Sequence, residues 1–255
     1  SNIQSLGCSG QYQNSKWTIT CPGETLSLKR LRLDSGSAEI KFQSGSGSIS
    51  ISDGIFVAGA AELILPPVNL NIARSSGLAV DVSGSGTLML GRSDTVVSEI
   101  NIVGNVSTEG NSCIIFGAAT KHRIDGSVEI GGAAVFGRGI YALSGALDFT
   151  KGSNRTCDGI NITAQGIGGE SGCGKANGGA LCVGGGQANI RLDAPASGVF
   201  QDMLIVGPLN SGQDKDIILE AGGNGTTLSG VIYAPNSEVN VSGNATIRAS
   251  AGGCV

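Results

Sequence analysis

Aromatic and charged side chains are scarce in this sequence of 255 residues, at 4% and 14% of the positions. The net charge is −4 and there is no sustained run of lysine or arginine, so binding to a nucleic-acid backbone is not expected. Histidine occurs once and no two cysteines form a Cys-x-x-Cys pair, which argues against a structural zinc site. We therefore expect neither a metal nor a cofactor.

Long apolar runs are missing as well. The most apolar segment, residues 55–68, carries Glu62 and is shorter than the roughly 20 residues that a membrane-spanning helix needs. It is predicted to form two buried strands. Contact with a membrane would then require an anchor that is absent from this chain.

Glycine is abundant, with 43 residues, but it has no every-third-residue period, which excludes a collagen helix. A short pattern recurs instead: a glycine, a small or polar residue, and then apolar, polar and apolar residues. The steps between copies are about 18–22 residues or multiples of that length. The pattern begins at Gly47, Gly86, Gly104, Gly126, Gly145, Gly186 and Gly243.

This period predicts an all-β, right-handed parallel β-solenoid (β-helix) with coils of about 18–22 residues and little helix. Alternation along the strands predicts that one set of apolar residues faces the core. These residues are Ile49, Ile51, Leu88, Leu90, Val128 and Ile130. A β-sandwich is the competing all-β fold, but it needs clear hairpin turns every 8–12 residues.

The solenoid is predicted to be a single domain with two irregular parts. Residues 1–34 break the pattern and are expected to form an N-terminal cap, with a bend near Lys29. The solenoid then covers residues 35–255. A glycine-rich stretch at 166–186 fits no strand and is predicted to be an inserted loop.

Several of the seven cysteines lie in Gly/Ser-rich turns, as in disulfide-bonded exported proteins. Cys8 with Cys21 would close an N-terminal loop, and Cys173 with Cys182 would close the glycine-rich segment, although sequence alone leaves the connectivity open. Cys113 and Cys157 are further disulfide candidates. Because the number is odd, Cys254 is the candidate for a free thiol.

Catalytic motifs are weak. Residues 169–176 resemble a phosphate-binding loop, but Ala176 stands where a magnesium-binding hydroxyl is needed. His122 lies among charged residues and is expected in a charged turn between coils. The serious alternative is a carbohydrate-active β-helix enzyme, a polysaccharide lyase or hydrolase, whose carboxylates would project from adjacent coils. The candidates for that role are Asp81, Asp125, Glu129 and Asp148. Asp125 and Asp148 are 23 residues apart, about one coil, so these two could stack.

Four segments late in the chain form a familiar series: GIYALSGALDFT (139–150), GINITAQG (159–166), ANIRLDAPASGVFQDMLIV (188–206) and LSGVIYAPNSEVNVSGNATIRASAGGC (228–254). This order resembles the C-terminal region of bacterial tight-adherence pilus assembly proteins of the TadG-like kind, and of PilX-like pilus proteins. The resemblance implies a noncatalytic, exported protein that is held by an N-terminal hydrophobic anchor. It carries over no catalytic residue.

We therefore predict a noncatalytic structural or adhesive subunit of a bacterial surface appendage, located at the cell surface or outside the cell. Its expected partners are other pilus or cell-surface proteins, and a host or surface ligand. In the most specific part of the resemblance, Pro235 should end a strand and Asn236 should close the turn that follows. Tyr233 is expected to pack inside as part of this structural corner.

Overall fold

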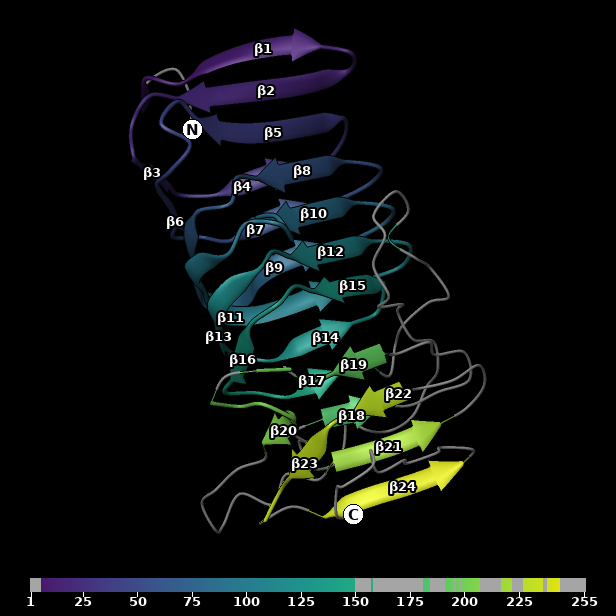
Figure 1. The fold of residues 1–255 in the computed structure, drawn as a ribbon. Helices are drawn as coiled ribbons and strands as arrows, with labels where there is room; N and C mark the ends of the chain where they lie inside the picture. Colours follow the sequence, from purple (N-terminus) through teal and green to yellow (C-terminus); the bar gives the residue numbers. More distant parts are fainter. Residues whose placement is uncertain are drawn as a thin grey trace.

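The computed structural model describes residues 6–149, 157, 181–183, 191–194, 196–197, 199–206, 217–221, 227–235 and 238–243. Within these residues there is no α-helix, and almost all strands pair in parallel. The strands stack coil upon coil along one axis (Figure 1). The predicted all-β parallel β-solenoid is confirmed.

One side of the solenoid, here called the first face, is a seven-stranded sheet in the order β1-β2-β5-β8-β10-β12-β15. Its strands are β1 (Ser9–Gln13), β2 (Lys16–Cys21), β5 (Ser37–Phe42), β8 (Glu62–Leu65), β10 (Thr87–Leu90), β12 (Cys113–Phe116) and β15 (Ala133–Phe136). Only β1 with β2 is antiparallel in this sheet.

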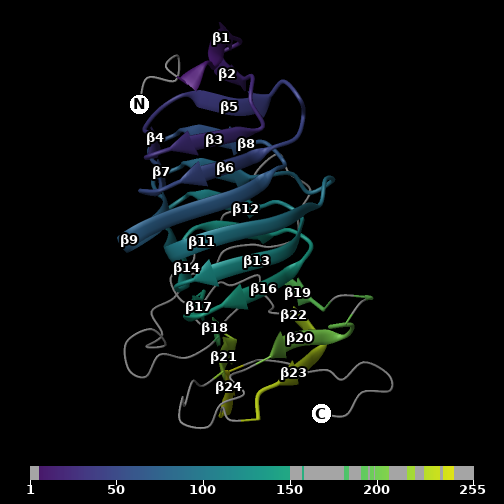
Figure 2. The same ribbon diagram turned by 90° about the vertical axis from the view of Figure 1, so that its left-hand side faces the viewer.

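A 13-stranded sheet wraps around the other two sides, because the long strands β9 (Asn69–Val82) and β11 (Val97–Thr108) each turn a corner. The second face (Figure 2) contains β3 (Thr25–Leu28), β6 (Ser48–Ile51), the first parts of β9 and β11, β13 (Ala119–Asp125) and β16 (Ile140–Leu143). The third face contains β4 (Leu31–Leu33), β7 (Ile55–Val57), the second parts of β9 and β11, β14 (Val128–Ile130), β17 (Leu147–Asp148), β18 (Leu181–Val183), β21 (Ile217–Ala221) and β24 (Val239–Gly243).

Two short parallel pairs complete the described strands. One joins β19 (Arg191–Asp193) to β22 (Thr227–Ser229), and the other joins β20 (Met203–Val206) to β23 (Val231–Tyr233).

Coil length varies along the solenoid. Hydrogen-bonded residues on neighbouring coils are 19 residues apart for Ser144 with Asp125, but 30 apart for Asn101 with Asn71. The steps from β13 to β16 and from β14 to β17 are 19 residues, within the predicted 18–22. The first-face steps from β5 through β8 and β10 to β12 are 25 or 26 residues and exceed that range. The segments SGSGSISI (44–51) and SGSGTLML (83–90) are similar in sequence but do not stack on each other. The first contains β6 of the second face, and the second contains β10 of the first face.

The predicted inward positions are buried in every case: Ile49, Ile51, Leu88, Leu90, Val128 and Ile130. They continue as columns through neighbouring coils, such as Leu63, Leu88 and Ile114 on the first face. Stacking identical faces lets each apolar side chain pack on its equivalents above and below. Burial of these columns is the main stabilising contribution to the fold.

Corners depend on glycine where coils approach closely. Gly126 follows Gly104 by one coil, and a Cβ built on Gly126 would lie 2.5 Å from the Gly104 carbonyl oxygen. Gly104 has a φ of +121°, which favours glycine. The recurring glycine of the sequence therefore reflects contact between backbones at this corner.

Two boundaries differ from the prediction. Parallel pairing begins at Lys16 in β2 and continues in β3 and β4, so the expected cap at 1–34 is too long, and only β1 departs from the parallel pattern. The predicted loop at 166–186 ends too late, since β18 pairs with β17 and β21. The rest of that loop lies outside the described residues.

Candidate binding groove

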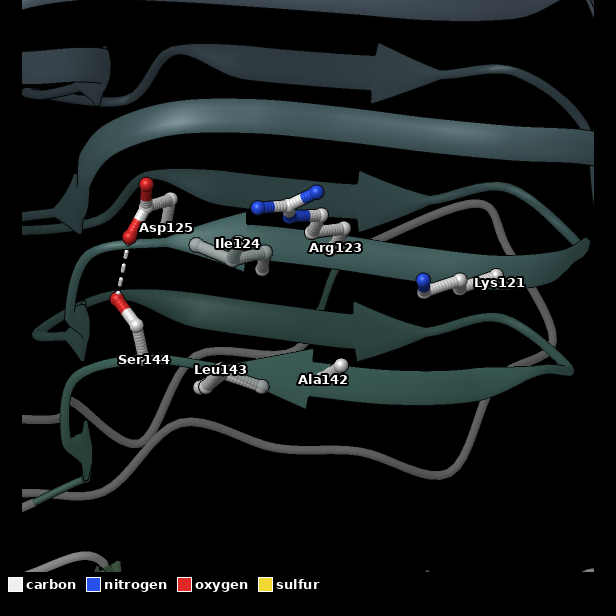
Figure 3. Close-up of a pocket in the computed structure, with 7 residues that line it drawn as sticks. All are labelled: Lys121, Arg123, Ile124, Asp125, Ala142, Leu143 and Ser144. Carbon is white, nitrogen blue, oxygen red and sulfur yellow. Dashed lines mark hydrogen bonds between the residues drawn. The ribbon is translucent and has the colours of Figure 1, made fainter.

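The structure has a hollow of about 220 Å³ on the second face (Figure 3). We call it the basic groove; it is lined by Lys121, Arg123, Ile124, Asp125, Ala142, Leu143 and Ser144. The lining side chains come from two neighbouring coils, from β13 and from the end of β16. The groove thus lies where two coils meet on the outside of the solenoid.

Strand alternation explains the composition of the basic groove. Along β13, His122 and Ile124 are buried, whereas Lys121, Arg123 and Asp125 are exposed. Arg123 stands in register with Ala142, whose methyl group leaves room that a longer side chain would fill. The result is two cationic side chains next to the open space over Ala142.

The floor beneath the groove is rigidly packed. His122 is fully buried, and its ring stacks on Tyr141 with centroids 3.9 Å apart and an interplanar angle of 3°. The His122 Nε2 lies 2.8 Å from the Gly117 carbonyl oxygen, and the Tyr141 hydroxyl donates to the Gly137 carbonyl. Phe116 meets both rings edge-on. The floor therefore holds β13 and β16 in fixed register.

His122 is thus a core residue, and its expected place in a charged turn is wrong. The alternation of β13 puts it inward, which a reading of the local charges alone overlooked. Burial lowers the pKa of His122, and the contact of its Nε2 with the Gly117 carbonyl opposes this shift only in part. The ring is therefore held in its neutral form and is not available to a substrate.

Six cations of the described surface form ion pairs, whereas the two cations of the groove, like Lys29 and Arg138, do not. Among the described residues, ion pairs involve Lys16, Arg30, Arg32, Lys41, Arg74 and Arg92. None of them involves Lys121 or Arg123. Glu99 is the register neighbour of Lys121 on the preceding coil, and Asp125 accepts a hydrogen bond from the Ser144 hydroxyl at 2.7 Å. Both cationic heads thus remain available to an anion.

A polar surface leads along the second face to the groove. Its outward residues form two columns, which together we call the Ser/Asn face: Thr25, Ser48, Asn69, Glu99 and Lys121 in one, and Ser27, Ser50, Asn71, Asn101 and Arg123 in the other. The Asn101 amide donates to the Asn71 side chain at 2.9 Å. The face is uncharged over its first coils and becomes charged where the basic groove begins.

The acidic candidates are arranged differently from the prediction. Asp125 and Asp148 do not stack. The neighbour of Asp125 on the next coil is Ser144, whereas Asp148 is in register with Glu129. Asp81, Ser107, Glu129 and Asp148 form one outward column on the third face. Ser107 and Asp148 are nevertheless buried, so this column does not open as a groove. The pKa of Asp81 is raised by burial and by Glu109.

Two disulfides are present among the residues that the structure describes. Cys8 bonds Cys21, as one predicted pairing required, and Cys113 bonds Cys157. The pairing of Cys173 with Cys182 and the state of Cys254 concern side chains outside the described residues. The two disulfides indicate a non-reducing environment.

The second disulfide marks a small outer core that the sequence analysis missed. Cys113, Ile115, Ala133, Val135 and Cys157 are buried together on the outer side of the first face, with Met89 against them. The sequence does indicate this outer core, because the strands TLML, CIIF and AAVF have apolar residues at outward as well as inward positions. Such strands are typical of sheets that are covered on both sides.

The corner at Tyr233 is only partly as predicted. Strand β23 ends at Tyr233, before Pro235, but Tyr233 is 49% exposed as a residue. Ile232 packs against the core instead, so the expected parity is wrong and the ring is not buried. Asn236 lies outside the described residues.

Within the described residues, no cluster of three metal-binding side chains occurs, and no helix is long and apolar enough to span a membrane. Comparison with known family models, curated proteins and solved structures finds no match.

Proposed function

We propose that this chain is a noncatalytic, exported β-solenoid subunit of a bacterial surface appendage, associated with a pilus, and that its adhesive site is the basic groove. The observation that carries the adhesive part is the pair of cations, Lys121 and Arg123, which lack an ion-pair partner among the described residues and lie beside a hollow. They suit a ligand that carries carboxylate, sulfate or phosphate groups.

Export is supported by the disulfides and by the resemblance of the C-terminal segments to pilus assembly proteins. The Ser/Asn face extends the site with hydroxyl and amide groups in adjacent coils. An acidic polysaccharide on a neighbouring cell or host surface presents the matching hydroxyls and anions.

The alternative is a polysaccharide lyase or hydrolase. The register of Glu129 with Asp148 favours it, because two carboxylates on adjacent coils could act on one sugar. Against it, Asp148 is buried and no described hollow adjoins this pair. Exposed aromatic platforms for a sugar are also absent from the described part of this face.

A binding assay tests the adhesive site. The protein is titrated with a carboxylated polysaccharide, polygalacturonate, and with neutral dextran. We expect binding to polygalacturonate alone, weakened by salt because the contacts are exposed. The double variant Lys121→Ala/Arg123→Ala should lose at least about tenfold in affinity, since each charge-assisted hydrogen bond contributes about 1.5–3 kcal/mol.

The matched control is Arg32→Ala/Arg92→Ala, which removes the same net charge from cations that are already paired with Asp34 and Asp94. It should bind like the wild type. Equal losses in both double variants would mean general charge attraction and would contradict the site. Shortening of the polymer, abolished by Glu129→Gln, would instead favour the enzyme.

Location is tested in cells that carry the full gene. Surface labelling of intact cells should reach the chain, and the Lys121→Ala/Arg123→Ala variant should reach the surface normally but reduce attachment. A chain that is protected from labelling, with all its thiols reduced, would contradict export.

A further inference from the structure

Strand β1 is the free edge of the first face. It pairs with β2 on one side only, and all five of its residues are exposed. It lies at the N-terminal end of the solenoid, and no described strand continues the sheet beyond it (Figures 1 and 2). An edge strand presents unpaired backbone N–H and C=O groups that can pair with another strand.

The features that usually protect an edge are missing from β1. Its sequence, SGQYQ, contains no charge and no proline, and its register with β2 is continuous without a bulge. The strand is also held in shape at both ends. Asn14 and Ser15 have φ values of 51° and 63°, as in a two-residue hairpin turn, and the disulfide from Cys8 to Cys21 closes the other end.

An aromatic pair stands beside this edge. The rings of Tyr12 and Trp17 have centroids 5.2 Å apart, and the two residues are 58% and 50% exposed. Trp17 is in register with the buried Ala38, and Tyr12 is the partner of Trp17, so both rings point to the inner side of the solenoid. The second face ends at β3, and nothing in the described residues covers the two rings. Gly10 lies on the same side of β1 as Tyr12. A Cβ built on Gly10 would lie 3.5 Å from the Trp17 ring, which is van der Waals contact.

Strand alternation decides which groups face the free edge. The residues that close a two-residue hairpin turn, Gln13 and Lys16, form a hydrogen-bonded pair, and such pairs alternate along antiparallel strands. Gln11 and Ser9 therefore direct their backbone groups to β2. Gly10 and Tyr12 direct theirs to the open side.

We propose that β1 pairs antiparallel with β1 of a second copy of this chain, about a two-fold axis at Gln11. In this register Gly10 of each copy faces Tyr12 of the other, and both residues offer their free backbone groups to each other. The Tyr12 ring of one copy then occupies the space over Gly10 of the other, against Trp17. A strand that is small on one side of its centre and large on the other is complementary to its own reversed copy.

This contact is isologous, so it closes as a dimer and does not propagate into a filament. Its area is small, because one five-residue strand and two rings on each copy make it. A preformed edge lowers the ordering cost of association. Dissociation in the micromolar range is the expected strength.

Sedimentation velocity of the disulfide-intact protein over the micromolar range tests the proposal. The wild type should pass from monomer to dimer as its concentration rises. In the proposed register the two Gln11 side chains lie directly opposite, so Gln11→Lys and Gln11→Glu should each weaken the dimer by about a hundredfold through like-charge repulsion. An equimolar mixture of the two variants should associate again.

Thr18→Lys is the control, since Thr18 is the β2 partner of Gln11 and lies one strand from the edge. It should dimerise like the wild type. Because Gln11 is exposed, thermal unfolding should confirm that every variant is folded. A wild type that stays monomeric, charge variants that still dimerise, or a mixture that fails to associate would each overturn the pairing.

Discussion

Val106 and Val239 occupy the same inward column of the third face, yet only one of them is sealed from water. Backbone pairing connects the two positions from coil to coil through Val128, Leu147, Leu181 and Ile217. Val106 is fully buried between coils, whereas Val239 is 42% exposed. Each is followed by a polar residue, Ser107 in one strand and Asn240 in the other.

The difference is one of position in the stack. Strand β24, which holds Val239, pairs with β21 on one side and ends the described sheet. A solenoid residue is covered by the coils above and below, so the same side chain stabilises the fold far more in the middle than at an end. Trp17 at the opposite end is half-exposed for the same reason.

The two tyrosines give the largest expected contrast. Tyr141 stacks on His122, meets Phe116 and donates to Gly137, so Tyr141→Ala should cost about 3–5 kcal/mol of unfolding free energy. Tyr233 is half-exposed on the outward parity, so Tyr233→Ala should cost less than about 1 kcal/mol. Denaturant unfolding of both variants measures the difference.

Equal losses at the two tyrosines would show that the C-terminal coils are as tightly sealed as the middle ones. Loss of attachment without loss of stability in Tyr233→Ala would instead make Tyr233 a contact with a partner.

The valine pair is the next contrast, with identical chemistry at both sites. Val106→Ala should destabilise by about 2–3 kcal/mol, from lost burial of two methyl groups and the cavity that remains. Val239→Ala should stay within about 0.5 kcal/mol of the wild type. A large loss at Val239 would mean that further chain or a partner covers the end of the column.

Strand alternation in the sequence predicts the inward residues of the fold but not the arrangement of its faces. Alternation identified Ile49, Leu88 and Val128 as inward residues, because a buried face must repeat every second residue. It does not record which face a strand belongs to. The segments around Gly47 and Gly86 therefore looked like one repeat although they lie on different faces.

The groove was harder to find than the core. Lys121 and Arg123 appear in the sequence as ordinary outward charges, and only the register with Ala142 reveals the space beside them. Register between coils of unequal length cannot be read from one sequence, because the loops absorb the differences. For the same reason Glu129, and not Asp125, proved to be the register partner of Asp148.

A histidine in the sealed region provides the smallest and most specific test. Burial lowers the pKa of His122 below its unfolded value of about 6.5, so the unfolded chain binds the proton more readily than the folded one. Stability is therefore complete above about pH 6.5 and falls as the pH decreases toward the folded pKa. The slope from this group is at most about 1.4 kcal/mol per pH unit.

His122→Phe keeps a ring against Tyr141 and removes the titration, so the difference in unfolding free energy between this variant and the wild type should change between pH 7.5 and pH 5. Carboxylates that titrate in the same range contribute equally to both proteins and cancel in that difference. Parallel pH profiles would mean that His122 binds its proton as easily in the folded chain, and that the floor of the groove is open to water.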